Sequence, residues 1–186
     1  MTPKRLQRLV VCMLFDETLR ERVYNRCSET LSRFEISAMD WENLTRCDRR
    51  RWSADQTRCA RALTGLIDEF PVSILLFRRH FDFTQLNSFF TAQSFHDAIL
   101  NDESLALTFG HWLEKRLSDV SSIALIETAV ARCRRGIERH AERGQYVLNP
   151  SVLPLEVPAG TTELYARLRA SLPQAASELM VHLCQP

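Results

Sequence analysis

The sequence predicts a mainly α-helical protein, in which a helical bundle is followed by a small antiparallel β-sheet with one short helix. Apolar residues recur at helical spacing through most of residues 1–143, and helix-capping signals separate the segments. The composition changes after Gly144, because five of the seven prolines lie beyond it among short β-like segments. We therefore expect a helical bundle over residues 1–143 and a β-α-β region over residues 144–186.

The first part of the bundle begins with a long amphipathic stretch. Residues 4–27 place apolar side chains near helical spacing with arginines between them. Asp16 interrupts this stretch, and we expect it to cap a break in the helix. Residues 28–52 are less regular. Residues 53–56 have the sequence Ser-Ala-Asp-Gln, the spacing of a capping box, which predicts that Ser53 starts the next helix.

Proline and capping residues mark the later helices of the bundle. Pro71 fits the first turn of a helix, where its missing N–H costs nothing. Asp119 is a candidate cap for a long helix that would end near Gly144. The remaining predicted helix starts and segments are 82–85, 94–97 and 105–117.

The C-terminal region predicts three short strands and one helix. Residues 145–148 and 152–157 are β-like segments separated by an Asn-Pro-Ser turn signal. Thr161 and Thr162 then cap a short helix, and the apolar residues 178–184 are short enough to form a last strand. These segments predict a small antiparallel sheet whose last strand is C-terminal.

An exposed strand edge is the strongest candidate binding site in this sequence. Unpaired N–H and C=O groups at such an edge accept an extended peptide as an additional strand. The alternative is that the edge is covered by the helix that begins at Thr161 or twisted away by the prolines. The candidate peptide-binding positions are Tyr146, Leu148, Val181 and Leu183.

Arginine dominates the basic residues, with 22 arginines and 2 lysines in the chain. The formal net charge is only +1, which argues against a protein that binds nucleic acid through its overall charge. Codon usage in a GC-rich genome explains the arginine count equally well. Two clusters stand out, one at Arg46, Arg49, Arg50 and Arg51, the other at Arg132, Arg135, Arg139 and Arg143.

The second cluster has spacings of 3, 4 and 4, which place its side chains on one helix face. We interpret both clusters as docking surfaces for a protein partner. The alternatives are a solvated face with ion pairs inside the helix, and a DNA-binding regulatory protein that uses the face from Arg132 to Arg143. DNA binding of this kind would fall steeply with salt.

The usual signatures of catalysis are missing from the sequence. It contains no glycine-rich phosphate loop, no nucleophile elbow and no His-Glu-x-x-His motif, and its five histidines lack the spacing of a helical metal site. We therefore assign no catalytic residue, metal ligand or cofactor to this chain. The alternative is a stand-alone enzyme with a Cys/His site assembled from distant residues, for which Cys184 is the first candidate nucleophile.

Cysteine usage indicates the compartment. The six cysteines form no Cys-x-x-Cys pair and lie in apolar periodic segments, and no secretory signal peptide precedes them. No apolar run approaches the roughly 20 residues that span a bilayer. We expect a cytoplasmic protein with reduced thiols and without a membrane or nucleic acid as partner.

Four segments, in order and spacing, resemble the HvfC/MbnC group of helical proteins. They include the sequence Glu69-Phe70-Pro71-Val72, a helical segment from Ser118 to Glu127, and a Leu-Asn-Pro-Ser turn where the group has Leu-His-Pro-Ser. The resemblance extends over residues 58–157. The four matching segments are residues 62–72, 81–95, 118–127 and 148–153.

The short length and the predicted β-α-β region are most similar to the MbnC branch of this group. The resemblance implies a partner enzyme, MbnB-like, which has a TIM-barrel fold and carries the iron. Together, such subunits use oxygen to convert cysteines of a ribosomally made precursor peptide into oxazolone and thioamide groups of methanobactin, a copper chelator. The resemblance thus implies a non-catalytic subunit that holds the leader part of the peptide.

Overall fold

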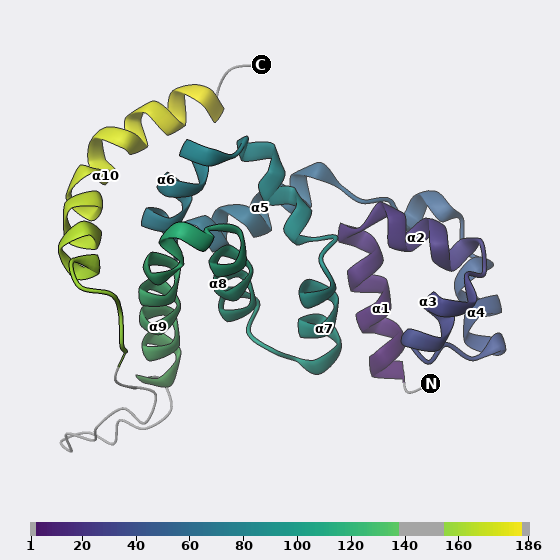
Figure 1. Cartoon of the computed structure of the whole chain (residues 1–186). Coiled ribbons are helices and arrows are strands. Elements are labelled where there is room, and N and C mark those ends of the chain that lie inside the picture. Colours follow the sequence, from purple (N-terminus) through teal and green to yellow (C-terminus); the bar gives the residue numbers. More distant parts are fainter. Residues whose placement is uncertain (1–2, 138–154, 184–186) are drawn as a thin grey trace. The chain divides into compact units, whose positions relative to one another are not determined.

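The computed structural model describes residues 3–137 and 155–183, and these residues form helices joined by loops (Figure 1). The chain divides into two compact units. Unit 1 comprises Met1–Thr64 and Thr84–Thr108, and unit 2 comprises Gly65–Phe83 and Phe109–Pro186.

Unit 1 contains the N-terminal helices and one helix from the middle of the chain. Helices α5 and α8 contribute residues to both units. The elements wholly in unit 1 are α1 (Pro3–Phe15), α2 (Glu17–Tyr24), α3 (Ser28–Arg33), α4 (Ala38–Thr45), the 3-10 helix η1 (Arg49–Trp52) and α7 (Gln93–Asn101), and the shared ones are α5 (Gln56–Ile67), η2 (Phe83–Phe89) and α8 (Leu105–Arg116).

The break between the first two helices lies where the sequence predicts it. Helix α1 ends at Phe15, and Asp16 has extended backbone geometry as the N-cap of α2. Its Oδ1 accepts a hydrogen bond of 3.1 Å from the backbone N–H of Leu19. The carboxylate therefore satisfies one of the amide groups that a helix start leaves without a partner.

Helix α5 begins three residues later than the predicted cap. Its first residue is Gln56, and Oδ1 of Asp55 accepts a hydrogen bond of 2.9 Å from the backbone N–H of Thr57. The prediction of a helix at this place is confirmed, but the capping side chain is Asp55 and not Ser53. An aspartate one residue before the helix caps as well as a serine, so the sequence pattern allowed both.

The core of unit 1 forms where α1 packs against α2 and α7. Leu9, Met13 and Phe34 are fully buried in it. Beside them, the ring centroids of Phe15 and Phe90 lie 5.1 Å apart in a stacked pair. The apolar face of α1 thus fixes the position of α7, which is distant in the sequence.

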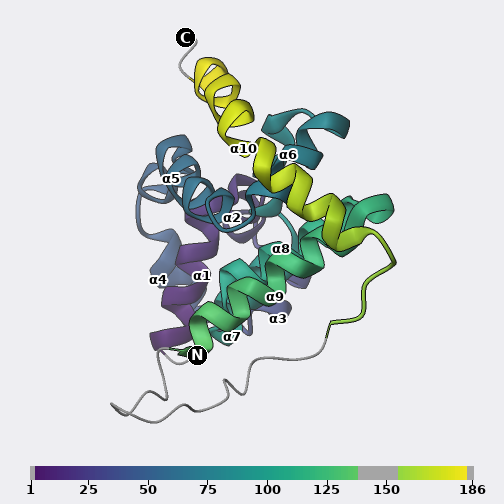
Figure 2. The same ribbon diagram turned by 90° about the vertical axis from the view of Figure 1, so that its left-hand side faces the viewer.

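Unit 2 is built from helices α6 (Pro71–His80), α9 (Ser121–Ile137) and α10 (Thr161–Leu183), with the short 3-10 helix η3 (Ser118–Val120) before α9. Helix α6 packs against both α9 and α10, and Figure 2 shows α10 crossing close to α6. Pro71 is the first residue of α6, as its sequence position predicts.

Aromatic rings and one close helix approach hold unit 2 together. Phe70 and Phe109 meet edge to face, and the ring of Trp112 stacks on Phe109 at 5.7 Å between centroids. An added Cβ at Gly110 would lie 2.1 Å from the hydroxyl oxygen of Thr128 and 2.8 Å from the ring of Phe70. Helices α8 and α9 therefore approach so closely that only glycine fits at this position.

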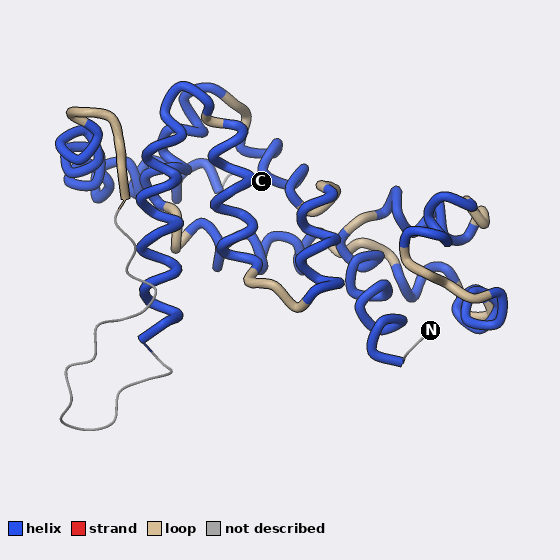
Figure 3. The backbone as a smooth tube through the Cα atoms, turned by 60° about the horizontal axis from the view of Figure 1, so that its bottom comes forward, coloured by secondary structure: helices blue, strands red, loops and turns tan. Residues whose placement is uncertain are grey.

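The predicted C-terminal sheet is wrong. In the described part of the chain every regular element is a helix and no residue lies in a strand (Figure 3). Residues 155–157, the end of the predicted second strand, are irregular, and residues 178–183, the described part of the predicted last strand, belong to α10. The first predicted strand, residues 145–148, lies outside the described residues.

Two physical reasons explain this error. Pro154 and Pro158 have no N–H to donate to a sheet, so the segment between them pairs poorly. A short apolar run is equally compatible with a buried helix, and residues 174–180 are rich in alanine, leucine and methionine, which favour helices. Helix α10 continues past Pro173, and it bends along its length (Figure 1).

Candidate functional site

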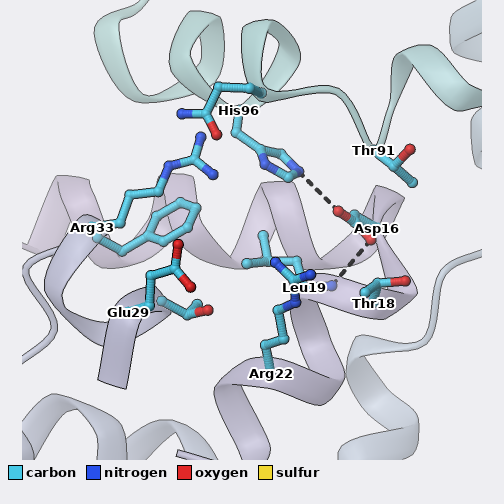
Figure 4. A pocket seen from close by; sticks show the side chains of 11 residues that line it. Asp16, Thr18, Leu19, Arg22, Glu29, Arg33, Thr91 and His96 are labelled. Atoms are coloured by element: carbon cyan, nitrogen blue, oxygen red, sulfur yellow. Dashed lines mark hydrogen bonds and ion pairs between the residues drawn. The ribbon is translucent and has the colours of Figure 1, made fainter. Parts of the chain in front are cut away.

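A pocket of about 470 Å³ lies in unit 1 where residues of α2, α3 and α7 come together. Figure 4 shows that its side chains are mainly polar and charged and that they come from different helices. The volume lies in the range of ligand-binding pockets, roughly 300–1,000 Å³. The pocket is therefore the candidate ligand-binding site of unit 1.

Asp16 and His96 form a buried pair at the edge of this pocket. Nε2 of His96 lies 3.1 Å from Oδ2 of Asp16 (Figure 4), and the two residues are each 4% exposed. Burial alone would raise the pKa of Asp16, but the His96 contact and the backbone N–H groups of Leu19 and Thr18 outweigh it. The pKa of Asp16 consequently lies below its usual value.

The second ring nitrogen of His96 is not satisfied by the protein. Neither buried ring nitrogen of His96 makes a well-directed hydrogen bond within the described residues: Nε2 has only the ion-pair contact with Asp16 at 3.1 Å, and Nδ1 has no polar partner at all. Its ring packs edge to face on Phe34, with centroids 6.2 Å apart. Buried polar groups nearly always have a partner, so this nitrogen marks a position where a bound molecule would supply one.

Two arginine side chains line the pocket, and only one of them is ion-paired. Arg33 is held by an ion pair with Asp97, at 3.1 Å between Nη2 and Oδ1, and it covers the ring of Phe34. Arg22 is exposed and makes no ion pair with any described residue. Figure 4 shows both side chains reaching from their helices toward the space beside His96. Arg22 is thus available to an anionic group.

A second pocket of about 420 Å³ adjoins the first, because Arg33 and Gln93 line both. It is strongly basic, since Lys4, Arg5 and Arg8 also line it. Arg5 pairs with Glu35 at 2.7 Å, yet its Nε is buried with no hydrogen-bond partner within the described residues. We call the two pockets together the basic groove.

Unit 2 contains a different buried acid. Glu127 of α9 is 2% exposed, and its two carboxylate oxygens accept hydrogen bonds of 3.0 Å from the N–H of Val72 and 2.9 Å from the N–H of Ser73. Burial raises the pKa of Glu127 above its usual value, although the bonds from residues 72 and 73 and the charge of Arg169 oppose the shift. This carboxylate caps α6 in place of Phe70, the N-cap residue, whose side chain makes no capping bond.

The predicted peptide-binding residues are not assembled into a strand edge. Val181 and Leu183 lie in α10, so their assignment to an exposed strand is wrong. A helix pairs its own backbone groups and offers no edge for an extra strand. Tyr146 and Leu148 lie outside the described residues, so the structure does not place them.

The predicted docking arginines lie on separate units. Arg46 at the end of α4 pairs with Glu42 at 2.8 Å, and Arg49 of η1 pairs with Glu21. Arg50, also in η1, is exposed and has no ion-pair partner among the described residues.

Unit 2 carries the second arginine cluster. Arg132 and Arg135 lie on α9, and Arg139 lies outside the described residues. Nη1 of Arg135 donates to Oε2 of Glu69 at 2.7 Å, so part of this predicted face is already engaged within unit 2.

The thiols differ in their ionisation. Burial raises the pKa of Cys12 to about 12, which makes this thiol a poor nucleophile. The backbone and side chain of Thr30 lower the pKa of Cys27, at the start of α3. No group of three or more His, Cys, Asp or Glu side chains that could hold a metal occurs within residues 3–137 and 155–183.

Comparisons with protein-family models, curated proteins and solved structures find no match for this chain. Within the described ranges, none of the helices combines the length and the apolar character needed to cross a membrane. The resemblance to the HvfC/MbnC group therefore rests on the sequence segments alone.

The sequence contained only faint signals of the basic groove. The sequence predicts Asp16 only as a helix cap, and no spacing motif distinguishes His96 from the other histidines. In the structure Asp97 forms an ion pair with Arg33, whereas His96 contacts Asp16, which is 80 positions away in the sequence. Neither Arg22 nor Arg33 belongs to an arginine cluster in the sequence, so composition could not single them out.

Proposed function

We propose that this protein is a non-catalytic partner subunit of an iron-dependent peptide-modifying oxidase. It docks an MbnB-like TIM-barrel enzyme that carries the iron, and it holds the leader of a ribosomally made precursor peptide. Cysteines of that peptide are then converted to oxazolone and thioamide groups, as in the biosynthesis of the copper chelator methanobactin. The complex works in the cytoplasm.

One observation carries this proposal. Two of the segments that resemble the HvfC/MbnC group are 55 positions apart in the sequence, yet they meet through Glu127, which accepts hydrogen bonds from Val72 and Ser73. Glu69 of the first segment is also joined to α9, through Arg135. Residues that match a family pattern for structural reasons are expected to contact one another in this way. The contact supports a resemblance of whole structural units over chance matches of apolar residues.

The docking surface is best sought at guanidinium groups that no carboxylate of the chain holds. Arg50 of η1 is exposed and Arg132 of α9 is half-buried, and neither has an ion-pair partner in the described part of the chain. Arginine is enriched at protein interfaces because its planar guanidinium group donates several hydrogen bonds to carboxylates and carbonyls. A charge reversal at such a position slows association and weakens a complementary interface.

The test is co-expression of the full chain with the iron enzyme encoded beside it, followed by affinity purification and size-exclusion chromatography. We expect one peak that contains both proteins, with iron in the partner. Addition of the precursor peptide encoded nearby should yield oxygen-dependent mass changes at its cysteines, measured by mass spectrometry.

Variants make this test specific. Arg50→Glu should weaken the complex about tenfold, the change that about 1.4 kcal/mol produces. Glu156→Gln, an exposed position outside the arginine clusters, should leave it unchanged. A chain that elutes alone and leaves the peptide unmodified in the presence of the iron enzyme would contradict the proposal.

A further inference from the structure

We infer that the basic groove of unit 1 binds an extended acidic peptide segment, with a carboxylate at Arg22 and a backbone amide at Nδ1 of His96. The inference rests on the proposed function only in naming the occupant, which would be an acidic part of the precursor peptide. The groove itself is defined by the contacts of unit 1.

The ring of His96 is held in the groove by its neighbours in a position where it can recognise a ligand. Its ring is fixed on one side by Asp16 at 3.1 Å and on the other by the edge-to-face contact with Phe34. Asp16 is in turn held by the N–H of Leu19. A ring that is buried between Asp16 and Phe34, and whose Nδ1 has no polar partner in the described chain, leaves this nitrogen for a ligand group.

A peptide amide fits this nitrogen better than a simple anion does. Nδ1 accepts a hydrogen bond in the neutral ring with a proton on Nε2, and it donates one in the protonated ring. A backbone amide offers both an N–H donor and a C=O acceptor. A peptide can therefore satisfy Nδ1 in either state, whereas a carboxylate serves only one of them.

The charge of the groove selects an acidic peptide. Its two pockets are lined by five lysine and arginine side chains and by three carboxylates, those of Asp16, Glu29 and Asp97. Two of these acids are already engaged, Asp16 with His96 and Asp97 with Arg33. Arg22 remains exposed beside them, and its fork can bind a carboxylate with two hydrogen bonds.

The groove has room for several residues of an extended chain. Its pockets of about 470 and 420 Å³ adjoin at Arg33 and Gln93, and we expect an extended chain to reach from one to the other along these two side chains. In the second pocket the peptide would meet Lys4 and Arg8, which share Asp102 as their ion-pair partner. Acidic side chains of the peptide would thus find cationic groups along both pockets.

The experiment is a binding titration with the full chain alone, followed by fluorescence anisotropy. The probe is a fluorescein-labelled synthetic peptide in which glutamates alternate with serines, and the control probe has glutamines in their place. We expect the glutamate probe to bind and the glutamine probe to bind at least about tenfold more weakly, as loss of charge-assisted hydrogen bonds predicts.

Matched variants locate the site. Arg22→Gln should weaken binding of the glutamate probe about tenfold, whereas Arg61→Gln, at an exposed arginine of α5 outside both pockets and both arginine clusters, should not change it. In nitrogen NMR spectra of the wild-type chain, the Nδ1 resonance of His96 should shift as the probe is added. This readout needs no variant that could disturb folding.

Two outcomes would overturn the inference. One is equal binding of the probe by the wild-type chain and Arg22→Gln. The other is an equal loss of binding in Arg61→Gln, which would mean that the probe is attracted by overall charge. Because the iron enzyme is absent from this titration, failure here leaves the proposed function intact, and failure to form the enzyme complex leaves the groove intact.

Discussion

Asp16 of unit 1 and Glu127 of unit 2 are both buried carboxylates, but their pKa values are displaced in opposite directions. Burial acts on each in the same sense, because it penalises the charged form. Asp16 faces the imidazole of His96 as well as backbone N–H groups, and its pKa is lowered. For Glu127 burial dominates: the N–H groups of Val72 and Ser73 and the charge of Arg169 favour the charged form but do not outweigh it, and its pKa is raised.

The difference shows what each carboxylate does. Glu127 is enclosed by α6 and α9, where it replaces the missing cap of α6, so its role is to hold unit 2 together. Asp16 caps α2 but also orients His96 at the wall of an open pocket. Unit 2 uses its buried acid for structure, and unit 1 uses its buried acid to prepare a binding surface.

The largest expected effect comes from removing the acid of unit 2. Glu127→Ala should lower the free energy of unfolding by about 3 kcal/mol, because two buried N–H groups of α6 lose their acceptor. Urea denaturation followed by circular dichroism measures this change. Glu156→Ala is the matched control, since that glutamate is exposed, and it should change stability by less than about 0.5 kcal/mol. Equal stabilities of the two variants would refute the capping role of Glu127.

The packing beside Glu127 gives the next largest effect. Gly110→Ala should cost about 2 kcal/mol, because the new methyl group collides with Thr128 and the ring of Phe70. Gly65→Ala is the control, since nothing lies within 4 Å of its added Cβ in α5, and it should stabilise the protein by up to about 1 kcal/mol. Thermal unfolding of both variants tests this contrast, and a loss in neither would mean that α8 and α9 are not in close contact.

The smallest effect is the pH dependence, and it should have opposite signs at the two acids. The lowered pKa of Asp16 stabilises the fold above about pH 3.9, its unfolded value, and this contribution is lost as pH falls through the folded pKa. The raised pKa of Glu127 gives a contribution that is complete below about pH 4.3 and is lost as pH rises through the folded pKa.

Two isosteric variants separate these contributions. The stability advantage of the wild-type chain over Asp16→Asn should shrink on acidification, whereas its advantage over Glu127→Gln should grow. Urea denaturation at a series of pH values measures both differences. If both stability differences changed with pH in the same direction, the pKa values of the two carboxylates would not be displaced in opposite directions.

Local signals in the sequence predicted much of the helical part. Asp16 interrupts an apolar pattern and caps the next helix, and Pro71 begins α6, because both residues act on backbone groups within one turn. The wrong prediction of a strand at residues 178–183 also came from a local signal. A short apolar run satisfies either a strand or a helix, and local pattern alone does not choose between them.

The functional sites depend on contacts that local signals do not encode. His96 and Asp16 are 80 positions apart, and Glu127 lies 55 positions from Val72. Nothing in the sequence near His96 marks Asp16 as its partner, because the packing of α1 against α7 brings them together.

The sequence by itself determined that this chain is mainly helical, where several helices begin, and which segments resemble the HvfC/MbnC group. Only the tertiary structure decided that the C-terminal residues 178–183 extend a helix, that Glu127 caps α6, and that His96 stands with Arg22 in a basic groove. The physical reason is the sequence separation over which each interaction acts. Helix capping and hydrophobic periodicity act between residues a few positions apart, whereas tertiary packing selects the partners of buried charges from distant parts of the chain.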